Sequence, residues 1–304
     1  MFFILRALRS AITLWAILTI VFFATRMTGD PTSFLISPEL PEEQRIELRA
    51  KLGLDDDVGT QYVRYSAALL RGDFGQSFFS NRPVVELFVE RVPNTLLLTI
   101  PAFVLSVAIG MSAGLWAALH HNTVFDRFLT TGTIVGQAIP NFVLGIAAIL
   151  IFSLSLKLLP SGGMGTWKHL VLPVVTLALA TSANIARLVR SSMLEVLSQD
   201  YMRYARSKGL SPFRVVVKHG LRNAILPVLT VLGLQLGGLI AGAVVTESVF
   251  SWPGAGRLVI DAVMNRDFAM LQFGILVFSA AIILTNLLVD VGYGLLDPRV
   301  RGSS

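Results

Sequence analysis

The side chains best suited to chemistry in this chain lie in one basic segment, residues 198–227, between two apolar stretches. Its arginines and lysines can pair with acidic groups on another protein. Its first half predicts a helix with one distinct face, made at positions i, i+3, i+4 and i+7 by Tyr201, Tyr204, Ala205 and Lys208. We therefore expect this segment to bind a soluble partner, and the alternative is a basic loop that only sets membrane topology.

The same segment carries the signals of a helix, a corner and a second helix. Ser198 or Asp200 can cap the start of the first helix by accepting bonds from free backbone N–H groups. Gly209 suits the left-handed residue that follows a helix end. Ser211 followed by Pro212 predicts the start of the next helix. The segment is thus expected to form a slim elbow that can enter a groove on a partner.

Motifs for catalysis are missing from the sequence. The chain has no cysteine, which excludes disulfides and thiolate chemistry. It has no phosphate-binding glycine loop, no zinc-protease motif and no serine-hydrolase elbow. His120 and His121 have no carboxylate at ligand spacing, and Glu247 and Asp290 are expected to be solvated at the ends of apolar stretches. We therefore expect a protein that is not an enzyme and binds no metal or cofactor itself.

Several polar and small residues interrupt the apolar stretches. Five of them are side-chain amides: Gln137, Asn141, Asn184, Gln235 and Asn286. Such groups usually face the interior of a helix bundle, so they are candidates for lining a pathway, with interhelical hydrogen bonding as the alternative. Gln137 and Asn141 are expected on one helix face around Pro140. Four glycines permit close helix contact, within the chain or with another subunit: Gly233, Gly237, Gly238 and Gly242.

The composition shows which elements must position these residues. The chain is 54% hydrophobic and only 14% charged, whereas a soluble domain carries about 25% charged residues. Its net charge of +6 suits anionic lipid headgroups, and no basic and aromatic stripe indicates nucleic acid. Spanning the bilayer takes about 20 apolar residues in a helix. Six stretches qualify: 9–28, 95–119, 131–157, 170–190, 226–249 and 271–293.

The sequence therefore predicts an all-α polytopic membrane protein with six transmembrane helices. Basic residues gather between 190 and 222 and near both termini, which places these regions in the cytoplasm by the positive-inside rule. The first stretch is expected to remain as a membrane span. The outer region is expected to hold an amphipathic helix over 39–54 and a second helix near Tyr62. The expected parts are 1–29 with the first span, an extracytoplasmic insertion at 30–94, and a core at 95–304 with a cytoplasmic loop at 191–224.

The basic loop resembles a known signature. ABC transporter permeases carry the pattern EAA-x3-G-x9-I-x-L-P, and this loop is similar to the version found in the dipeptide/oligopeptide/nickel permease family. Ala205 and Gly209 align with the last Ala and the Gly of that pattern. Arg203 and Tyr204 replace its Glu-Ala, and Leu226-Pro227 comes about five residues late, which resembles the peptide branch of the family.

Other segments extend the resemblance over nearly the whole chain. They are residues 52–55, 61–62, 72–77, 91–95, 246–258 and 296–301. The usual proline after Asp55 is missing here. The long insertion between the first two spans resembles that of the first, B-type, permease subunit in such systems.

The resemblance implies a type I ABC importer permease fold in a bacterial cytoplasmic (inner) membrane. It implies a homologous second permease, two ABC ATPases that carry ATP and Mg, and an extracytoplasmic substrate-binding protein. The residues that it assigns to ATPase coupling are Asp200, Tyr201, Arg203, Tyr204, Ala205, Arg206, Lys208, Gly209, Leu210 and Pro212. Di- or oligopeptides are the default cargo, and nickel, glutathione, opines and sugars stay open. The competing functions are a secondary transporter or channel without an ATPase, and a membrane scaffold.

Overall fold

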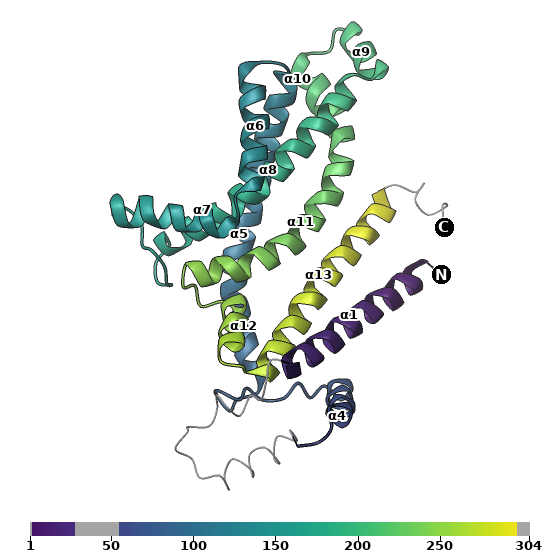
Figure 1. Ribbon diagram of the computed structural model, residues 1–304. Coiled ribbons are helices and arrows are strands. Elements are labelled where there is room, and N and C mark those ends of the chain that lie inside the picture. The colour runs from purple at the N-terminus through teal and green to yellow at the C-terminus, as the bar shows by residue number, and fades with distance from the viewer. Residues whose placement is uncertain (1, 28–54, 297–304) are drawn as a thin grey trace. The chain divides into compact units, whose positions relative to one another are not determined.

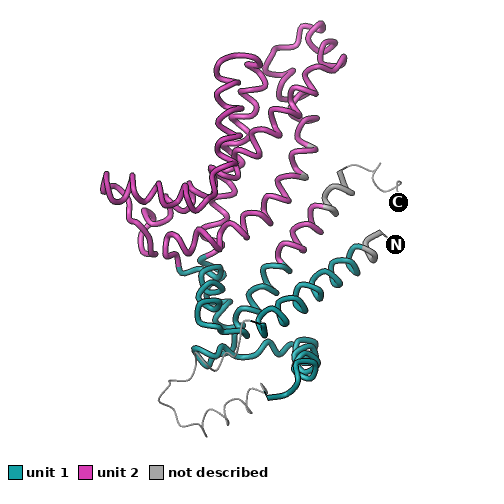
Figure 2. The backbone as a smooth tube through the Cα atoms, viewed as in Figure 1, with its two compact units in different colours: residues 1–94, 253–280 teal, residues 95–252, 281–304 magenta. Residues whose placement is uncertain are grey.

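A computed structural model describes residues 2–27 and 55–296 of the chain. The expected helix over 39–54 and the segment 297–301 lie outside the described residues. In the described part, the regular elements are helices, and one isolated antiparallel bridge joins Gln76 and Pro83. The chain divides into two compact units, residues 1–94 with 253–280 and residues 95–252 with 281–304 (Figure 2).

The described α-helices are labelled in Figure 1. In chain order they are α1 (Phe2–Met27), α4 (Val58–Leu70), α5 (Val84–Leu119), α6 (Val124–Ala138), α7 (Asn141–Ala148), the π-helical η1 (Ile149–Ser155), α8 (Lys168–Leu197), α9 (Asp200–Ser207), α10 (Pro212–Arg214), the π-helical η2 (Val215–Leu221), α11 (Arg222–Val249), α12 (Ala255–Met264) and α13 (Phe268–Leu296). Five of these helices are long and apolar enough to cross a membrane: α1, α5, α8, α11 and α13. Counting α6 with α7–η1 as one bent span gives the six spans that the sequence predicts.

The third predicted span is not one straight helix. α6 ends at Ala138, Ile139 is extended at φ −87° and ψ 120°, and the chain continues in α7 after a bend of 99°. Pro140 explains the break because proline pushes the preceding residue out of the helical region. The expectation that Gln137 and Asn141 share one helix face was therefore wrong, since they lie on different helices. The prolines Pro173 and Pro227, in contrast, lie inside continuous helices.

Unit 1 has an apolar core of its own. Its buried members come from the first turns of α5, from α12 and from the start of α13: Val84, Phe88, Ala255, Val259, Ala262, Met270 and Phe273. Asp267 fastens the loop before α5 to the start of α13, because its carboxylate accepts bonds from the Ser77 hydroxyl and from the Phe78 and Met270 N–H groups. The predicted helix near Tyr62 is confirmed as α4, and the Tyr62 hydroxyl lies 2.8 Å from that of Thr19 in α1.

Unit 2 is organised around α8, which packs against α5, α6, α7 and α11. Two glycines of α5 allow that helix to touch the α8 backbone. A Cβ on Gly110 would lie 2.9 Å from the Ser182 carbonyl oxygen, and one on Gly114 would lie 2.4 Å from that of Ala186. Gly233 of α11 meets Val289 within the same chain, where an added Cβ would clash with the valine side chain at 1.8 Å.

Candidate functional site

The basic segment forms the elbow that the sequence predicts. α9 follows the end of α8, Gly209 turns the chain, and α10 continues into η2 and α11 at one end of unit 2 (Figure 1). Gly209 has a φ of +71°, a left-handed conformation that glycine adopts at little cost. Ser211 holds the N-cap position of α10 and Pro212 its first turn, as predicted.

One expected cap of the elbow was wrong. The N-cap of α9 is Gln199, with no side-chain cap bond, and its carbonyl oxygen accepts from the Met202 N–H at 3.0 Å. The Ser198 hydroxyl instead donates to the Glu195 carbonyl oxygen, which closes the last turn of α8. Asp200 lies inside the first turn of α9, where its negative charge interacts favourably with the positive end of the helix dipole.

Three buried side chains fix the elbow to its own unit. Met202 and Ala205 of α9 pack against Val215 of η2, and all three are at most 6% exposed. The Met202 methyl group also approaches Gly220, where an added Cβ would be 3.5 Å away. Full burial of a methionine contributes about 1.5–3 kcal/mol. The elbow therefore has a defined position against η2 and the end of α8.

The opposite face of the elbow is open and basic. Arg203, Tyr204, Arg206 and Lys208 are exposed, and the Lys208 ammonium lies 4.6 Å from the centre of the Tyr204 ring. Beyond the corner, the Phe213 side chain is 77% exposed. Exposed aromatic side chains beside cations are typical of protein interfaces. No described residue covers Gly209, since an added Cβ would meet no atom within 4 Å.

Four of the five predicted pathway residues meet at a second place in unit 2. Gln137, Asn141, Asn184 and Gln235 line one cavity of 340 Å³, with Thr181 beside them. They come from four different helices, α6, α7, α8 and α11. Within the described part of the chain, none of the four amides makes a hydrogen bond to another residue. The fifth amide, Asn286 of α13, is half-buried and does not line this cavity.

The cavity is polar and uncharged. Its other lining residues are Gly136, Ile139, Ala180 and Gly238, so no ionised side chain lines it. An amide offers both a donor and an acceptor, and open amides can exchange water for the polar groups of a passing solute. This arrangement suits a neutral hydrogen-bonding pathway.

The expectation of a solvated Glu247 was wrong. Glu247 is fully buried near the end of α11, and its carboxyl oxygen accepts a 2.6 Å hydrogen bond from the Thr95 hydroxyl of α5. Its backbone carbonyl accepts from the Trp252 N–H at 2.8 Å. The side chain of Asp290 lies outside the described residues.

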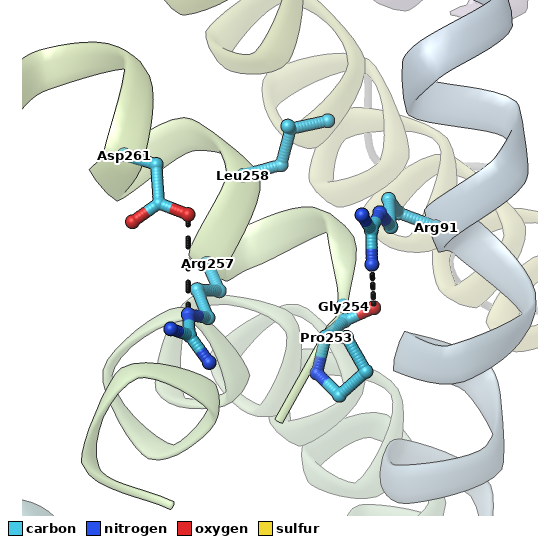
Figure 3. A pocket seen from close by; sticks show the side chains of 6 residues that line it. All are labelled: Arg91, Pro253, Gly254, Arg257, Leu258 and Asp261. Atoms are coloured by element: carbon cyan, nitrogen blue, oxygen red, sulfur yellow. Dashed lines mark hydrogen bonds and ion pairs between the residues drawn. The ribbon is translucent and has the colours of Figure 1, made fainter. Parts of the chain in front are cut away.

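Two of the family-like segments come together in unit 1. The Asn94 amide donates to the Pro253 carbonyl oxygen at 2.8 Å, and Arg91 reaches the same oxygen at 3.4 Å. Figure 3 shows Arg91 on one side of the Pro253–Gly254 turn and an ion pair of Arg257 with Asp261 on the other, around a hollow of 290 Å³.

The sequence did not reveal one ionic cluster of unit 2. Asp126, at the start of α6, is 2% exposed, and its carboxylate accepts both the Nε–H and an Nη2–H of Arg190 in α8. His121 Nδ1 lies 3.1 Å from the same carboxylate. The partners are 64 residues apart, so no local pattern links them.

A helical membrane protein with an exposed basic elbow at one end of unit 2 and an amide-lined cavity within the same unit has the architecture of an ABC importer permease. Residues 110–302 match one family throughout, and the chain belongs to it: the binding-protein-dependent transport system inner membrane components. The family consists of membrane permease subunits, so the chain itself is not catalytic. It is a multi-pass component of the inner membrane.

Relatives and solved structures agree with this family. The chain is 45% identical to the glutathione transport system permease protein GsiC of Escherichia coli strain K12, over 95% of each chain. It is 43% identical to GsiC of Salmonella typhimurium strain LT2 over 290 residues, 95% of each chain. Its fold is similar to a chain of the inward-facing MetNI methionine ABC transporter, with a TM-score of 0.61 and 18% identity over 71% of this chain and 98% of that one.

Proposed function

We propose that this chain is the first of two permease subunits in a bacterial importer of di- or oligopeptides. The second permease is a homologue, two ATPases supply the energy with ATP and Mg, and an extracytoplasmic protein delivers the substrate. Both termini and the elbow lie in the cytoplasm, and residues 30–94 lie outside. The similarity to a glutathione permease supports a peptide-like substrate, because glutathione is a tripeptide.

The observation that carries this proposal is the two-sided construction of the elbow. Met202 and Ala205 fasten it to the unit, whereas Tyr204, Arg206 and Lys208 are exposed. A segment that only set membrane topology would need the charges but not the buried anchor. Of the ten coupling residues named from the sequence, Ala205 belongs to this anchor, whereas Tyr204, Arg206 and Lys208 belong to the contact surface.

The mechanism follows from differential affinity. When the two ATPases close on ATP, they bind one permease conformation more tightly than the other, because its elbows fit the closed ATPases better. This difference in binding energy shifts the population toward that conformation. The elbow adjoins α8, which also contributes Thr181 and Asn184 to the cavity. We propose that the cavity amides line the route of the substrate, where they replace water around the peptide's backbone groups.

Substitution of Gly209 tests the proposal. An added Cβ at Gly209 meets no described atom within 4 Å, so the main internal cost expected for Gly209→Glu is left-handed backbone strain of about 1–2 kcal/mol. Gly209→Pro also removes the N–H that donates to the Arg206 carbonyl oxygen at 3.0 Å. We expect both variants to insert into the membrane but to lose co-purification with the co-encoded ATPases.

Gly72 supplies a matched control. It also follows a helix with a positive φ of +78°, meets no atom within 4 Å, and donates to the Leu69 carbonyl oxygen at 3.0 Å. Gly72→Pro should therefore leave the ATPase association intact. If the Gly209 variants retain their ATPases as fully as Gly72→Pro does, the coupling assignment is wrong.

A further inference from the structure

An ionic cluster lies at the elbow end of unit 2, and the coupling mechanism proposed above assigns no role to it. Asp126 is 2% exposed, and the Arg190 guanidinium approaches it with two N–H groups, one to each carboxylate oxygen. The Asn122 N–H adds a third bond at 3.0 Å. Charge-assisted pairs with two parallel bonds fix orientation as well as distance, so the pair determines how α6 lies against α8.

The two helices joined by this pair lead to the two functional places of unit 2. In α8, the cavity residues Thr181 and Asn184 come first and Arg190 follows them. The elbow begins after Leu197, where α8 ends. α6 carries Asp126 in its first turn and Gln137 near its last residue. The turn between α5 and α6 lies at the same end of unit 2 as α9 and α10 (Figure 1). The ion pair thus joins the two helices near the elbow, and both helices continue to the cavity.

The closest backbone packing on α8 in this region comes from α5 and not from α6. The glycine contacts that bring a neighbour onto the α8 backbone belong to α5, at Gly110 and Gly114. On α6, an added Cβ would meet no atom at Gly132 and would only touch Ala183 at 4.0 Å at Gly136. An apolar hollow of 370 Å³ lies beside α6 and α8, and it is lined by Phe128 and Leu179 together with residues of α5 and α7. A loosely packed interface depends more on a directional pair than a tightly packed one does.

We propose that Asp126 and Arg190 are positioning residues that make α6 follow α8 when the elbow moves. Movement of the elbow then carries both cavity-lining helices together, and the amide of Gln137 keeps its place opposite Asn184. This inference rests on the proposed function, because it assigns the pair to the step between ATPase movement and the substrate pathway.

Disulfide trapping between α6 and α8 tests the proposal without a known substrate. The chain has no cysteine, so Gly136→Cys with Ala183→Cys forms a unique pair, with Cβ atoms about 4.0 Å apart. That separation lies within the range of natural disulfides. The rate of disulfide formation is measured in the complete complex in membrane vesicles, without nucleotide and with ATP.

We expect equal trapping rates in the two nucleotide states while the ion pair is intact. In Asp126→Asn and Arg190→Gln, the trapping rate should fall by roughly twofold to thirtyfold when ATP is added. This fold-change corresponds to the coupling energies measured for such networks. Arg190→Lys keeps the charge and one bond, so it should give an intermediate rate. This rescue separates a positioning role from a general loss of stability.

Glu90→Gln is the matched control because Arg82 also approaches the Glu90 carboxylate with two nitrogen atoms, but at an exposed site of unit 1. It should leave the trapping rates unchanged. Trapping in Asp126→Asn that equals the parent in both states would overturn the proposal, and so would a parent rate that changes with ATP. A parent chain that retains no ATPase would instead contradict the proposed function.

Discussion

At the scale of single residues, the elbow places opposite environments within one helix of eight residues. Met202 is fully buried, whereas the Tyr204 side chain is 62% exposed. The sequence predicted one face containing both Tyr204 and Ala205, and the structure separates them because Ala205 turns inward with Met202. The helical period predicted which residues of α9 lie near one another on the helix surface, but it could not show which face of α9 the rest of the chain would bury.

Tyr204→Ala and Met202→Ala should therefore fail in different ways. Tyr204→Ala removes contact surface only, so we expect weaker ATPase association with unchanged thermal stability. Met202→Ala leaves a cavity under the elbow and should destabilise it by about 2–5 kcal/mol. Thermal unfolding of the detergent-solubilised chain, followed by titration with the ATPases, measures both effects. Equal loss of stability in the two variants would contradict the division into anchor and contact surface.

Glu247 gives a second prediction at this scale. Glu247→Ala leaves the Thr95 hydroxyl without its buried acceptor and should cost about 1–3 kcal/mol of stability. Glu247→Gln keeps an acceptor oxygen in the same place and should cost less. The two variants are compared by thermal unfolding, and an equal loss in both would show that the Thr95 bond is not what Glu247 contributes.

At the scale of elements, the apolar stretches predicted where the long helices lie but not their ends or breaks. The second span was expected from residue 95, yet α5 begins at Val84 because its first turns pack in the apolar core of unit 1. Hydropathy runs through Pro140, so the sequence did not predict that a bend of 99° divides this span into two helices. α12 was not predicted because its ten residues are too few to register as a span.

The loop after η1 offers a prediction about close backbone approach. A Cβ on Gly162 would lie 2.3 Å from the Phe250 carbonyl oxygen, which also accepts from the Gly163 N–H at 2.8 Å. Gly162→Ala should force the loop away from the end of α11 and cost about 1–3 kcal/mol. Gly132→Ala is the control, because it meets open space within α6 and should stabilise the helix by up to about 1 kcal/mol. Thermal unfolding that ranks the two variants in the opposite order would contradict this packing.

At the scale of the whole molecule, the chain combines an exposed basic elbow, which we propose binds an ATPase, with a polar cavity, which we propose lines the substrate route. The sequence predicted the family, the elbow and four of the cavity amides, because each depends on local pattern or on cost in lipid. It could not predict that Asp126 and Arg190 meet, or that Asn286 lies away from the other amides, since both depend on how distant helices pack. Tertiary contacts of this kind leave no trace in periodicity or composition.

We propose that a separate ATPase drives transport by binding the elbow and moving it. The cysteine-free chain allows one cysteine to be placed at Lys208, on the exposed face of α9, and another, in a separate variant, at Ser80 in unit 1. The measurement is cross-linking from each cysteine to the ATPases in inside-out membrane vesicles that contain the complete complex. The account predicts a cross-link from Lys208→Cys and none from Ser80→Cys. No cross-link from Lys208→Cys, in a complex that still hydrolyses ATP and transports, would contradict it.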